Sequence, residues 1–363
     1  MLQSISGGLK SISMKAQVFR GVNQLSYEEV PVPTIAPDEV LVKVAVVGLC
    51  QSDIKKIRYP LYEPPRIFGH ETAGTIAAVG ETVTSWQTGQ RVVVMHHIPC
   101  MHCAYCLNDN FSMCDVYKNI TTTAGFAPSG GGFADYVKVP GHIVRNGGLI
   151  PIPDHISFEQ ASFVEPTNCC LKAVKKADIK PGQTVLVTGA GPIGLMFIML
   201  VKYFGGIAIA TDLLPSRIEK ALQVGAEAAF DARDPELASK IQALTNGMGV
   251  DTALLAVPSE KAFFQALDCT RKGGKILFFA EFPDQVEIPL NPNILYRREI
   301  DLMGSYSSSY RVQALATDIV FNQRIDVDAL ISDRYSLKDL SAAVEQAIAP
   351  TPETYKILIY PST

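Results

Sequence analysis

A glycine-rich turn, Gly189-Ala190-Gly191-Pro192-Ile193-Gly194, joins an apolar β-branched run to a long apolar segment. In this setting Gly189 permits a tight turn, Gly191 lets the backbone approach a pyrophosphate, and Gly194 allows close packing of a helix on a strand. The phosphates would lie at the helix N-terminus beside Pro192 and Ile193, where unpaired N–H groups point outward. Such a turn can also serve chain reversal alone, so the neighbouring sequence must decide between a binding loop and a purely structural turn.

The residues that follow favour dinucleotide binding. A second apolar run ends at Asp212, 23 residues after Gly189, where an acidic side chain can hold the two ribose hydroxyls. Since its charge would repel a 2′-phosphate, Asp212 favours NAD over NADP. If Arg217 contacts the ribose or the adenine, its positive charge would weaken the preference for NAD. Alternatively, Arg217 is a solvated arginine on a helix face.

The second half of the chain alternates between the two element types. Apolar runs at 184–189, 206–212, 227–232, 249–257 and 273–281 are separated by helical segments. Continuous apolar strands with helices between them indicate a parallel sheet covered on both faces. We therefore predict an α/β protein with a doubly wound Rossmann domain over residues 166–309.

The first half has short strand-like runs between turn residues, at 16–20, 39–48, 71–80, 90–95 and 133–140. This pattern predicts a mostly antiparallel, barrel-like domain over residues 14–165. We expect the helix-rich tail 310–363, which ends in a strand-like run, to return to this domain. The first thirteen residues are expected to be a loose extension.

Composition excludes several classes. The chain has 363 residues, of which 47% are hydrophobic, so two domains with cores of their own are expected. Its 32 Lys and Arg are outnumbered by 36 Asp and Glu and form no long run, which argues against binding to nucleic acid or to an anionic membrane. No run is long enough to span a bilayer and no apolar leader is present, so we expect a cytoplasmic, reducing setting.

Four cysteines within 15 residues, Cys100, Cys103, Cys106 and Cys114, suggest a metal in that setting. Four thiolates close the tetrahedral shell of a structural zinc, which we place in a lobe over residues 96–117. The alternative is an iron–sulfur cluster, but the spacing matches neither ferredoxin pattern. His102 is expected to be a solvated bystander.

Cys50, His70, Glu71 and Glu165 offer one thiolate, one imidazole and two carboxylates. Each has an ordinary structural explanation when taken alone. Together they suit a catalytic zinc that keeps one position open. Because neighbouring residues of an extended chain point to opposite faces, His70 and Glu71 can reach one ion only if the backbone turns there.

Several motifs occur together in one order: GLCQSD at 48–53, GHE at 69–71, the four-cysteine lobe, GGFADYVKVP at 131–140 and GAGPIG at 189–194. In this order and spacing the chain resembles the zinc-dependent medium-chain alcohol dehydrogenases from Met14 onward. The Glu165-Pro166 pair makes it most similar to the sorbitol, polyol-phosphate and threonine dehydrogenase branch. The resemblance implies a GroES-like catalytic domain, an inserted Rossmann domain and an active site between them.

The resemblance also implies residue roles. Cys50, His70 and Glu165 match the protein ligands of the catalytic zinc, and Glu71 matches a glutamate that ligates zinc or is displaced by substrate. Asp53 matches the carboxylate that orients the ligand histidine, which suits its chemistry. Zinc would lower the pKa of the substrate hydroxyl, Ser52 would accept its proton, and hydride would leave to NAD.

The chain departs from the family at Lys55, which stands where most relatives end the proton relay with histidine. The relay could then end in water, or Lys55, Lys56 and Arg58 could face a phosphate or carboxylate of the substrate. A third interpretation is a solvated basic loop.

The leading interpretation is a dehydrogenase of secondary alcohols or polyols with two zinc ions per chain. Alternatives are an amino-alcohol or polyol-phosphate substrate, and a non-catalytic NAD-binding protein. The family implies a homodimer or homotetramer, often formed by joining Rossmann sheets edge to edge. Three minor interpretations remain: His96 and His97 could line the site or lie on the surface, while Cys169, Cys170 and Cys269 look like core thiols.

Overall fold

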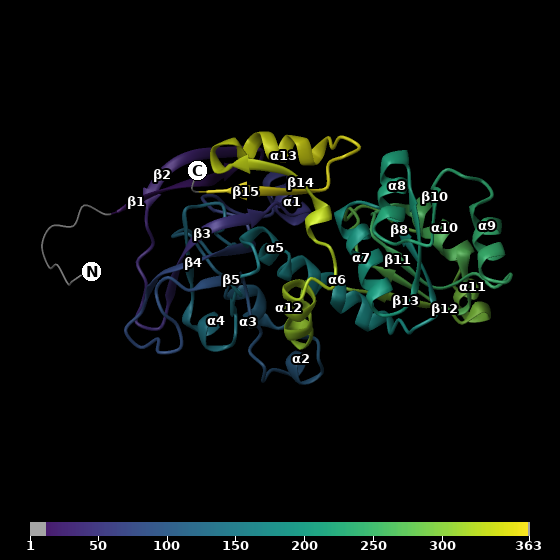
Figure 1. Cartoon of the computed structure of the whole chain (residues 1–363), viewed down its shortest axis with the longest axis horizontal. Coiled ribbons are helices and arrows are strands. Elements are labelled where there is room, and N and C mark those ends of the chain that lie inside the picture. The colour runs from purple at the N-terminus through teal and green to yellow at the C-terminus, as the bar shows by residue number, and fades with distance from the viewer. Residues whose placement is uncertain (1–11, 362–363) are drawn as a thin grey trace, which may run out of the picture. The chain divides into compact units, whose positions relative to one another are not determined.

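A computed structural model describes residues 12–361, so the expected loose extension lies mostly outside the described residues. The chain forms two compact units. The first runs to Glu165 and resumes at Ile331, and the second is Pro166–Leu330. Each unit is drawn in Figure 1 and is treated separately below.

The return to the first unit comes at Ile331 rather than at Tyr310. The buried side chain of Asn168 holds the preceding segment in the second unit: it accepts from the backbone N–H of Ser309 at 2.8 Å and donates to its carbonyl at 3.1 Å. These two hydrogen bonds join residues 141 positions apart, so local sequence patterns do not reveal them.

The first unit is built on a mostly antiparallel sheet in the order β14-β15-β3-β4-β5-β7, with β6 also paired to β3. The C-terminal segment supplies β14 and β15, which pair in parallel, and β15 joins β3 (Figure 1). The sheet strands are β3 (Val40–Gly48), β4 (Glu71–Val79), β5 (Arg91–Met95), β6 (Tyr136–Val139), β7 (Leu149–Pro151), β14 (Ile331–Ser336) and β15 (Lys356–Tyr360). A separate antiparallel pair consists of β1 (Ser13–Gly21) and β2 (Gln24–Pro31).

Short helices connect these strands. They are α1 (Gln51–Arg58), α2 (Ala104–Leu107), α3 (Asp115–Asn119), α4 (Gly141–Arg145), α5 (Phe158–Ser162) and α13 (Leu340–Ile348), with single 3₁₀ turns at Phe111–Met113 and Leu337–Asp339. Helix α1 replaces the solvated loop that we considered for residues 55–58.

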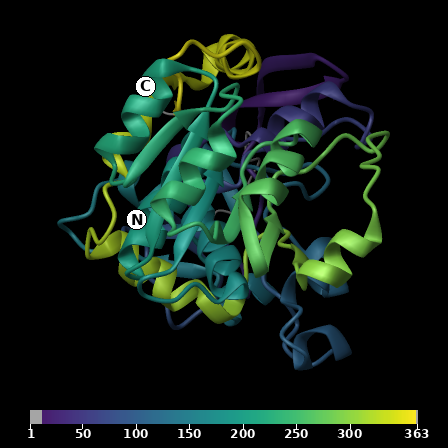
Figure 2. The same ribbon diagram turned by 90° about the vertical axis from the view of Figure 1, so that its right-hand side faces the viewer.

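The second unit has an all-parallel six-stranded sheet in the order β10-β9-β8-β11-β12-β13. Its strands are β8 (Thr184–Thr188), β9 (Ile207–Asp212), β10 (Ala228–Asp231), β11 (Val250–Leu255), β12 (Thr270–Phe278) and β13 (Asp301–Gly304). Its helices are α6 (Val164–Ala177, which begins in the first unit), α7 (Pro192–Tyr203), α8 (Pro215–Gln223), α9 (Leu237–Leu244), α10 (Glu260–Cys269), α11 (Pro292–Arg298) and α12 (Gln313–Phe321), with 3₁₀ turns at Tyr310–Val312 and Asp328–Leu330. Figure 2 shows this sheet with helices packed along it, the predicted Rossmann architecture.

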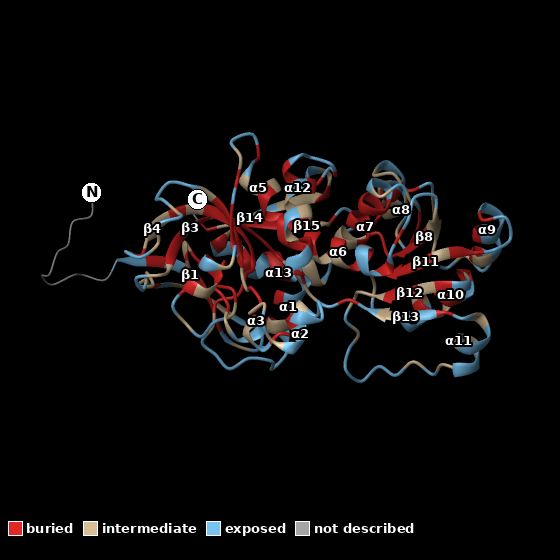
Figure 3. Cartoon of the chain, turned by 90° about the horizontal axis from the view of Figure 1, so that it is seen from below, coloured by how far each residue is buried: buried red, intermediate tan, exposed pale blue. Residues whose placement is uncertain are grey.

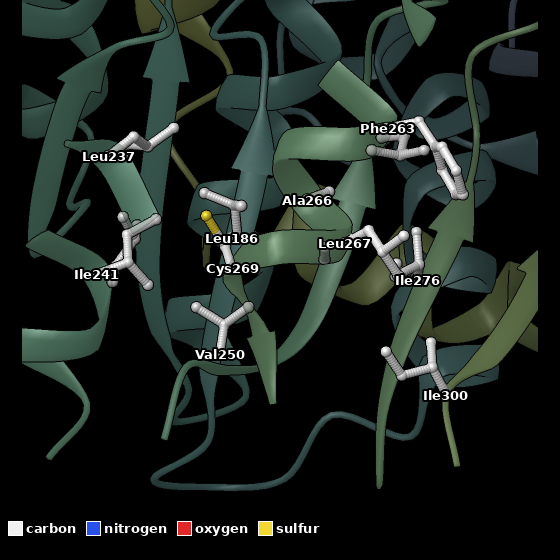
Figure 4. Packing of buried hydrophobic residues seen from close by; sticks show 13 residues of the cluster. Leu186, Leu237, Ile241, Val250, Phe263, Ala266, Leu267, Cys269, Ile276 and Ile300 are labelled. Carbon is white, nitrogen blue, oxygen red and sulfur yellow. The ribbon is translucent and has the colours of Figure 1, made fainter. Parts of the chain in front are cut away.

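The core of the second unit explains its apolar strands. β8 and β11 are buried along almost their whole length, as parallel strands covered on both faces must be (Figure 3). Leu186, Val250 and Ile276 of the sheet pack in one cluster with Phe263 and Leu267 of α10 (Figure 4). This packing sets the ends of β8 and β9, where the glycine-rich turn and Asp212 stand.

Candidate active site

Three of the four predicted catalytic ligands lie together in the first unit. The ligand atoms of Cys50, His70 and Glu71 all lie within 4.8 Å of one another. Cys50 immediately precedes α1, and Glu71 opens β4. Gly69 supplies the required backbone turn, with φ of 91°, and a Cβ there would lie 2.9 Å from the backbone nitrogen of Phe133.

The carboxylate of Glu71 fits against its neighbouring strand because residue 48 is glycine. Gly48 of β3 pairs with Glu71 of β4. A Cβ at residue 48 would lie 1.9 Å from Oε2 of Glu71, so any larger side chain would displace this carboxylate.

Glu71 forms a buried ion pair with Lys356, a residue that the sequence analysis missed. The Lys356 ammonium also donates to the carbonyl of Leu49 at 3.3 Å. Burial disfavours the charged lysine, but Glu71, Cys50 and Glu165 together outweigh burial and raise the pKa of Lys356 above its ordinary value. The only sequence signal was a lysine at the start of an apolar strand, which is ordinarily a solvated position.

Glu165, the fourth predicted ligand, is buried in the first turn of α6. Its carboxylate does not belong to the group whose ligand atoms all lie within 4.8 Å. It is near enough for its charge to help raise the pKa of Lys356. Its ligation of a metal stays a prediction.

Asp53 orients His70 as expected. Nδ1 of His70 lies 3.1 Å from Oδ1 of Asp53, and because a carboxylate only accepts, Nδ1 carries the proton and Nε2 is left for a metal. Burial disfavours the charged form of Asp53, but His70 and Lys56 outweigh it and lower the pKa of this carboxyl well below its ordinary value. The same carboxylate and the Cys50 sulfur raise the pKa of His70 despite its burial, so the site attracts positive charge.

Ser52 lies beside two of the ligand atoms. Its Oγ is 3.4 Å from the sulfur of Cys50 and 3.5 Å from Nε2 of His70, and the residue is exposed. A hydroxyl in this place can pass a proton from the site to solvent.

The three basic residues 55, 56 and 58 differ in their surroundings. Lys56 is 3.2 Å from Oδ1 of Asp53, and its ammonium lies 5.6 Å from the ring centre of Phe68. Arg58 is exposed, while Lys55 is half-buried and ends the helix with its carbonyl accepting from Tyr59. Lys56 is therefore engaged by the protein itself.

His96 and His97 are half-buried and belong to a row of rings in tilted and edge-to-face contact. The ring of His96 lies 4.8 Å from that of His70 and 3.6 Å from that of His97, which in turn is 3.6 Å from Tyr117. Burial lowers the pKa of both His96 and His97 well below the ordinary value, so both are neutral. Tyr117 packs on the four-cysteine lobe, so this row of rings runs from the lobe to His70.

The lobe brings its four cysteines together as predicted. All four sulfur atoms lie within 4.8 Å of one another, and Cys106 and Cys114 are buried. The backbone N–H of His102 stabilises a thiolate and lowers the pKa of Cys100 to about 6. His102 itself is exposed, with Nδ1 2.7 Å from the carbonyl of Cys100, which fits a bystander.

Both clusters fit zinc in their donor chemistry. Four converging sulfur ligands suit a closed structural site, and a thiolate, an imidazole and a carboxylate suit a site that leaves one position open.

The nucleotide loop has the predicted geometry. Gly189 adopts φ of 87° directly after β8, and a Cβ at Gly194 would lie 1.8 Å from the carbonyl oxygen of Gly189. At Gly191, in contrast, a Cβ would meet nothing closer than Nη1 of Arg217 at 4.0 Å. The loop thus has open space at the position where a pyrophosphate would approach.

Asp212 ends β9 and holds this loop. Oδ2 accepts from the N–H of Ala190 at 2.7 Å, and Oδ1 accepts from Leu214 at 3.0 Å. Arg217, in α8, has its guanidinium near Gly191. Both residues therefore lie beside the glycine-rich turn, and their contact with a cofactor stays a prediction.

Comparison with known proteins agrees with this geometry. Residues 36–154 match the family Alcohol dehydrogenase GroES-like domain, and residues 192–321 match Zinc-binding dehydrogenase. The chain belongs to the zinc-dependent alcohol dehydrogenase family. Within it, the chain is a medium-chain dehydrogenase of the polyol branch and an enzyme acting on an alcohol or polyol.

Individual relatives cover nearly the whole chain. The sorbitol dehydrogenase of Bacillus subtilis is 35% identical over 360 residues, covering 96% of this chain and 98% of the relative. The D-arabitol-phosphate dehydrogenase of Enterococcus avium is 29% identical over 350 residues, covering 95% and 96%. A zinc-binding dehydrogenase from Sinorhizobium meliloti 1021, solved with bound NADP, has a TM-score of 0.86 and 27% identity, covering 96% of this chain and all of that one.

The remaining predictions concern isolated features. Cys170 and Cys269 are buried and Cys169 is half-buried. Burial raises the pKa of Cys269 to about 12, so this thiol is inert.

Of the helices in the described part of the chain, none combines the length and apolar character that a membrane crossing requires.

Proposed function

We propose that this dehydrogenase oxidises a secondary alcohol or polyol by hydride transfer to NAD, with one catalytic and one structural zinc per chain. The convergence of Cys50, His70 and Glu71 beside the exposed hydroxyl of Ser52 carries this proposal. The intact ligand set argues against the alternative of a non-catalytic NAD-binding protein.

Cys50, His70 and Glu165 would hold the catalytic ion. Bound zinc would act as a Lewis acid on the substrate oxygen, and nicotinamide would accept the hydride. Asp53 fixes the His70 tautomer that presents Nε2. Ser52 takes up the substrate's proton, and Glu71, paired with Lys356, supplies a carboxylate whose charge is already compensated.

NAD rather than NADP is proposed because of Asp212. Its carboxylate is held at the end of β9 by two backbone N–H groups, so it cannot easily swing away from a 2′-phosphate. The guanidinium of Arg217 near Gly191 works in the opposite direction and would reduce the preference. One relative of the same fold was solved with bound NADP, so the fold alone does not exclude that cofactor.

An unphosphorylated substrate is proposed because Lys56 is bound to Asp53 and so cannot also face a substrate phosphate. A polyol phosphate stays the second candidate, since one relative is named for such a substrate. An amino alcohol is the third.

We further propose that two or four copies assemble through β13. This strand pairs with β12 on one side only, and three of its four residues are exposed. Main-chain groups on such an edge can continue a sheet into a second copy. A cytoplasmic location stays a prediction.

The substrate test is a panel assay of NADH formation with sorbitol, arabitol, arabitol phosphate, threonine and simple alcohols, repeated with NADP. The proposal predicts the highest kcat/KM for an unphosphorylated polyol with NAD. A clear preference for the phosphate ester would contradict the substrate proposal, and a preference for NADP would contradict the role of Asp212.

A further inference from the structure

One oxygen of Asp53 carries all of its hydrogen bonds. Oδ1 lies 3.1 Å from Nδ1 of His70, 3.2 Å from the ammonium of Lys56 and 3.4 Å from the N–H of Gly69. Oδ2 is buried and has no hydrogen-bond partner among the described residues. The donors therefore fix both the position of the carboxylate and which oxygen faces the histidine.

Lys56 is part of the site rather than of the surface. Only 19% of its side chain is exposed, and its ammonium lies 5.6 Å from the ring centre of Phe68. Burial disfavours its charge, but Asp53, with smaller contributions from Tyr62 and Cys50, outweighs burial and raises the pKa of Lys56 above its ordinary value. Its charge also reaches Cys50 and His96, so it acts on the surroundings of the metal ligands.

The charges around the site form matched pairs. Asp53 is completely buried, and when Nε2 of His70 binds a metal, the imidazole is neutral. Lys56 is then the one full positive charge within hydrogen-bond distance of Asp53 in the described part of the chain. In the same way, the positive charge of Lys356 compensates the negative charge of Glu71.

We propose that Lys56 is a positioning residue that neutralises Asp53 and thereby limits how tightly the catalytic metal is held. The inference rests on the proposed function, because it needs a catalytic zinc held by Cys50 and His70. Without Lys56, the negative charge of Asp53 would act on the metal through His70 without opposition. The ion would then leave more slowly.

The test measures zinc release to a chromogenic chelator from the fully loaded enzyme. Zinc is expected to leave the wild type in two kinetic phases, one for each site. The phase that is absent in Cys50→Ser is assigned to the catalytic ion. In Lys56→Met this phase is expected to be at least about threefold slower, because a positive charge near the dication is removed. Lys56→Arg keeps the charge, and Lys43→Met makes the same change at an exposed site of β3; both are expected to release zinc at the wild-type rate.

Thermal unfolding adds a second readout. Lys56→Met is expected to lower the melting temperature of the metal-free protein, since it removes the lysine charge that compensates the buried Asp53, and to widen the gap in melting temperature between metal-free and loaded protein. A lysine that only filled space would lower both melting temperatures alike and would speed zinc release. Faster or unchanged release in Lys56→Met, or slower release in Lys56→Arg, would overturn the proposal.

The two levels of the account fail differently. If the wild type shows no Cys50-dependent release phase, the proposed function fails. If that phase exists but does not slow in Lys56→Met, only the role of Lys56 is wrong.

Discussion

Buried lysines are the least expected residues of the site. Lys356 and Glu71 are 285 positions apart, and both side chains are at least nine-tenths buried. A buried ion pair adds little net stability, but removal of one partner leaves a charge without compensation. Replacing Lys356 is therefore expected to destabilise the fold most when Glu71 is still present and ionised.

Lys356→Met is predicted to lower the free energy of unfolding of the metal-free protein by about 3 to 5 kcal/mol. Because Glu71→Gln removes the charge left behind, the double variant should be less destabilised than the sum of the two single variants. Urea unfolding of all four proteins measures this coupling. Additive effects, or a cost below about 1 kcal/mol for Lys356→Met, would show that the pair is not coupled.

Site residues with a local signature could be predicted from the sequence. Cys50, Asp53, His70 and Glu71 lie in two short motifs, and a residue type carries the chemistry at each position. Lys356 could not be predicted, because only strand pairing between β15 and β3 brings it to the site. For Lys56 the sequence suggested a substrate anion or solvent as its surroundings, but not its pairing with Asp53, which depends on the unpredicted helix α1.

At the scale of elements, the turn between β8 and α7 separates two glycine requirements. The Cβ of Ala at 194 would overlap the carbonyl of Gly189, whereas at 191 it would meet open space. Glycine is therefore required at 194 for packing, whereas at 191 it is required only to leave room for a ligand.

Gly194→Ala is predicted to cost about 1 to 3 kcal/mol of stability through overpacking. Gly191→Ala, its matched control, should leave stability within about 0.5 kcal/mol but weaken NAD binding, because the new methyl group occupies the approach of the pyrophosphate. Chemical unfolding and NAD titration of both variants measure this. Equal stability losses, or unchanged NAD affinity in Gly191→Ala, would contradict it.

Helix α6 carries a predicted pH dependence. Burial lowers the pKa of Lys172 to about 8 from an ordinary value of 10.5, and its ammonium donates to the carbonyl of Tyr306 at 2.6 Å. Between pH 8 and 10.5 the unfolded chain keeps this proton while the folded chain releases it, so folding is relieved of a penalty as pH rises. The stability of wild type relative to Lys172→Met should therefore increase over this range and stay constant below pH 8. Urea unfolding at several pH values would show a flat difference if the lysine were ordinary.

Most strands could be predicted because burial dictates their composition. β3, β4, β5 and the strands of the second unit other than β13 were expected within a few residues of their observed ends. β2 was missed because its sequence, QLSYEEVP, is polar, with one buried residue. Helix α1 was missed because it is only eight residues long and two apolar residues, Ile54 and Ile57, are all that mark its buried face.

For the whole molecule, the assembly rests on the exposed edge at β13. Leu302, 38% exposed there, should contact a second copy if the sheets join. Leu302→Asp is predicted to shift the protein toward the monomer, because two like charges would meet across the interface. Leu244→Asp, at an exposed leucine that ends α9, is the control. Light scattering that finds a wild-type monomer would rule out the assembly.

The domain organisation was predictable in outline but not in its final boundary. Alternating strands and helices mark the second unit, whereas its end at Leu330 depends on contacts such as Asn168 with Ser309. These are long-range contacts between residues of ordinary composition.

The central claim is that Cys50, His70 and their neighbours form a catalytic zinc site distinct from the four-cysteine lobe. It is tested most directly by counting zinc per chain and measuring polyol-dependent NADH formation in wild type and Cys50→Ser. The account predicts two zinc ions and turnover in the wild type, and one zinc ion without turnover in the variant. A wild type fully active with a single zinc, or a Cys50→Ser protein that keeps both zinc ions and its activity, would contradict it.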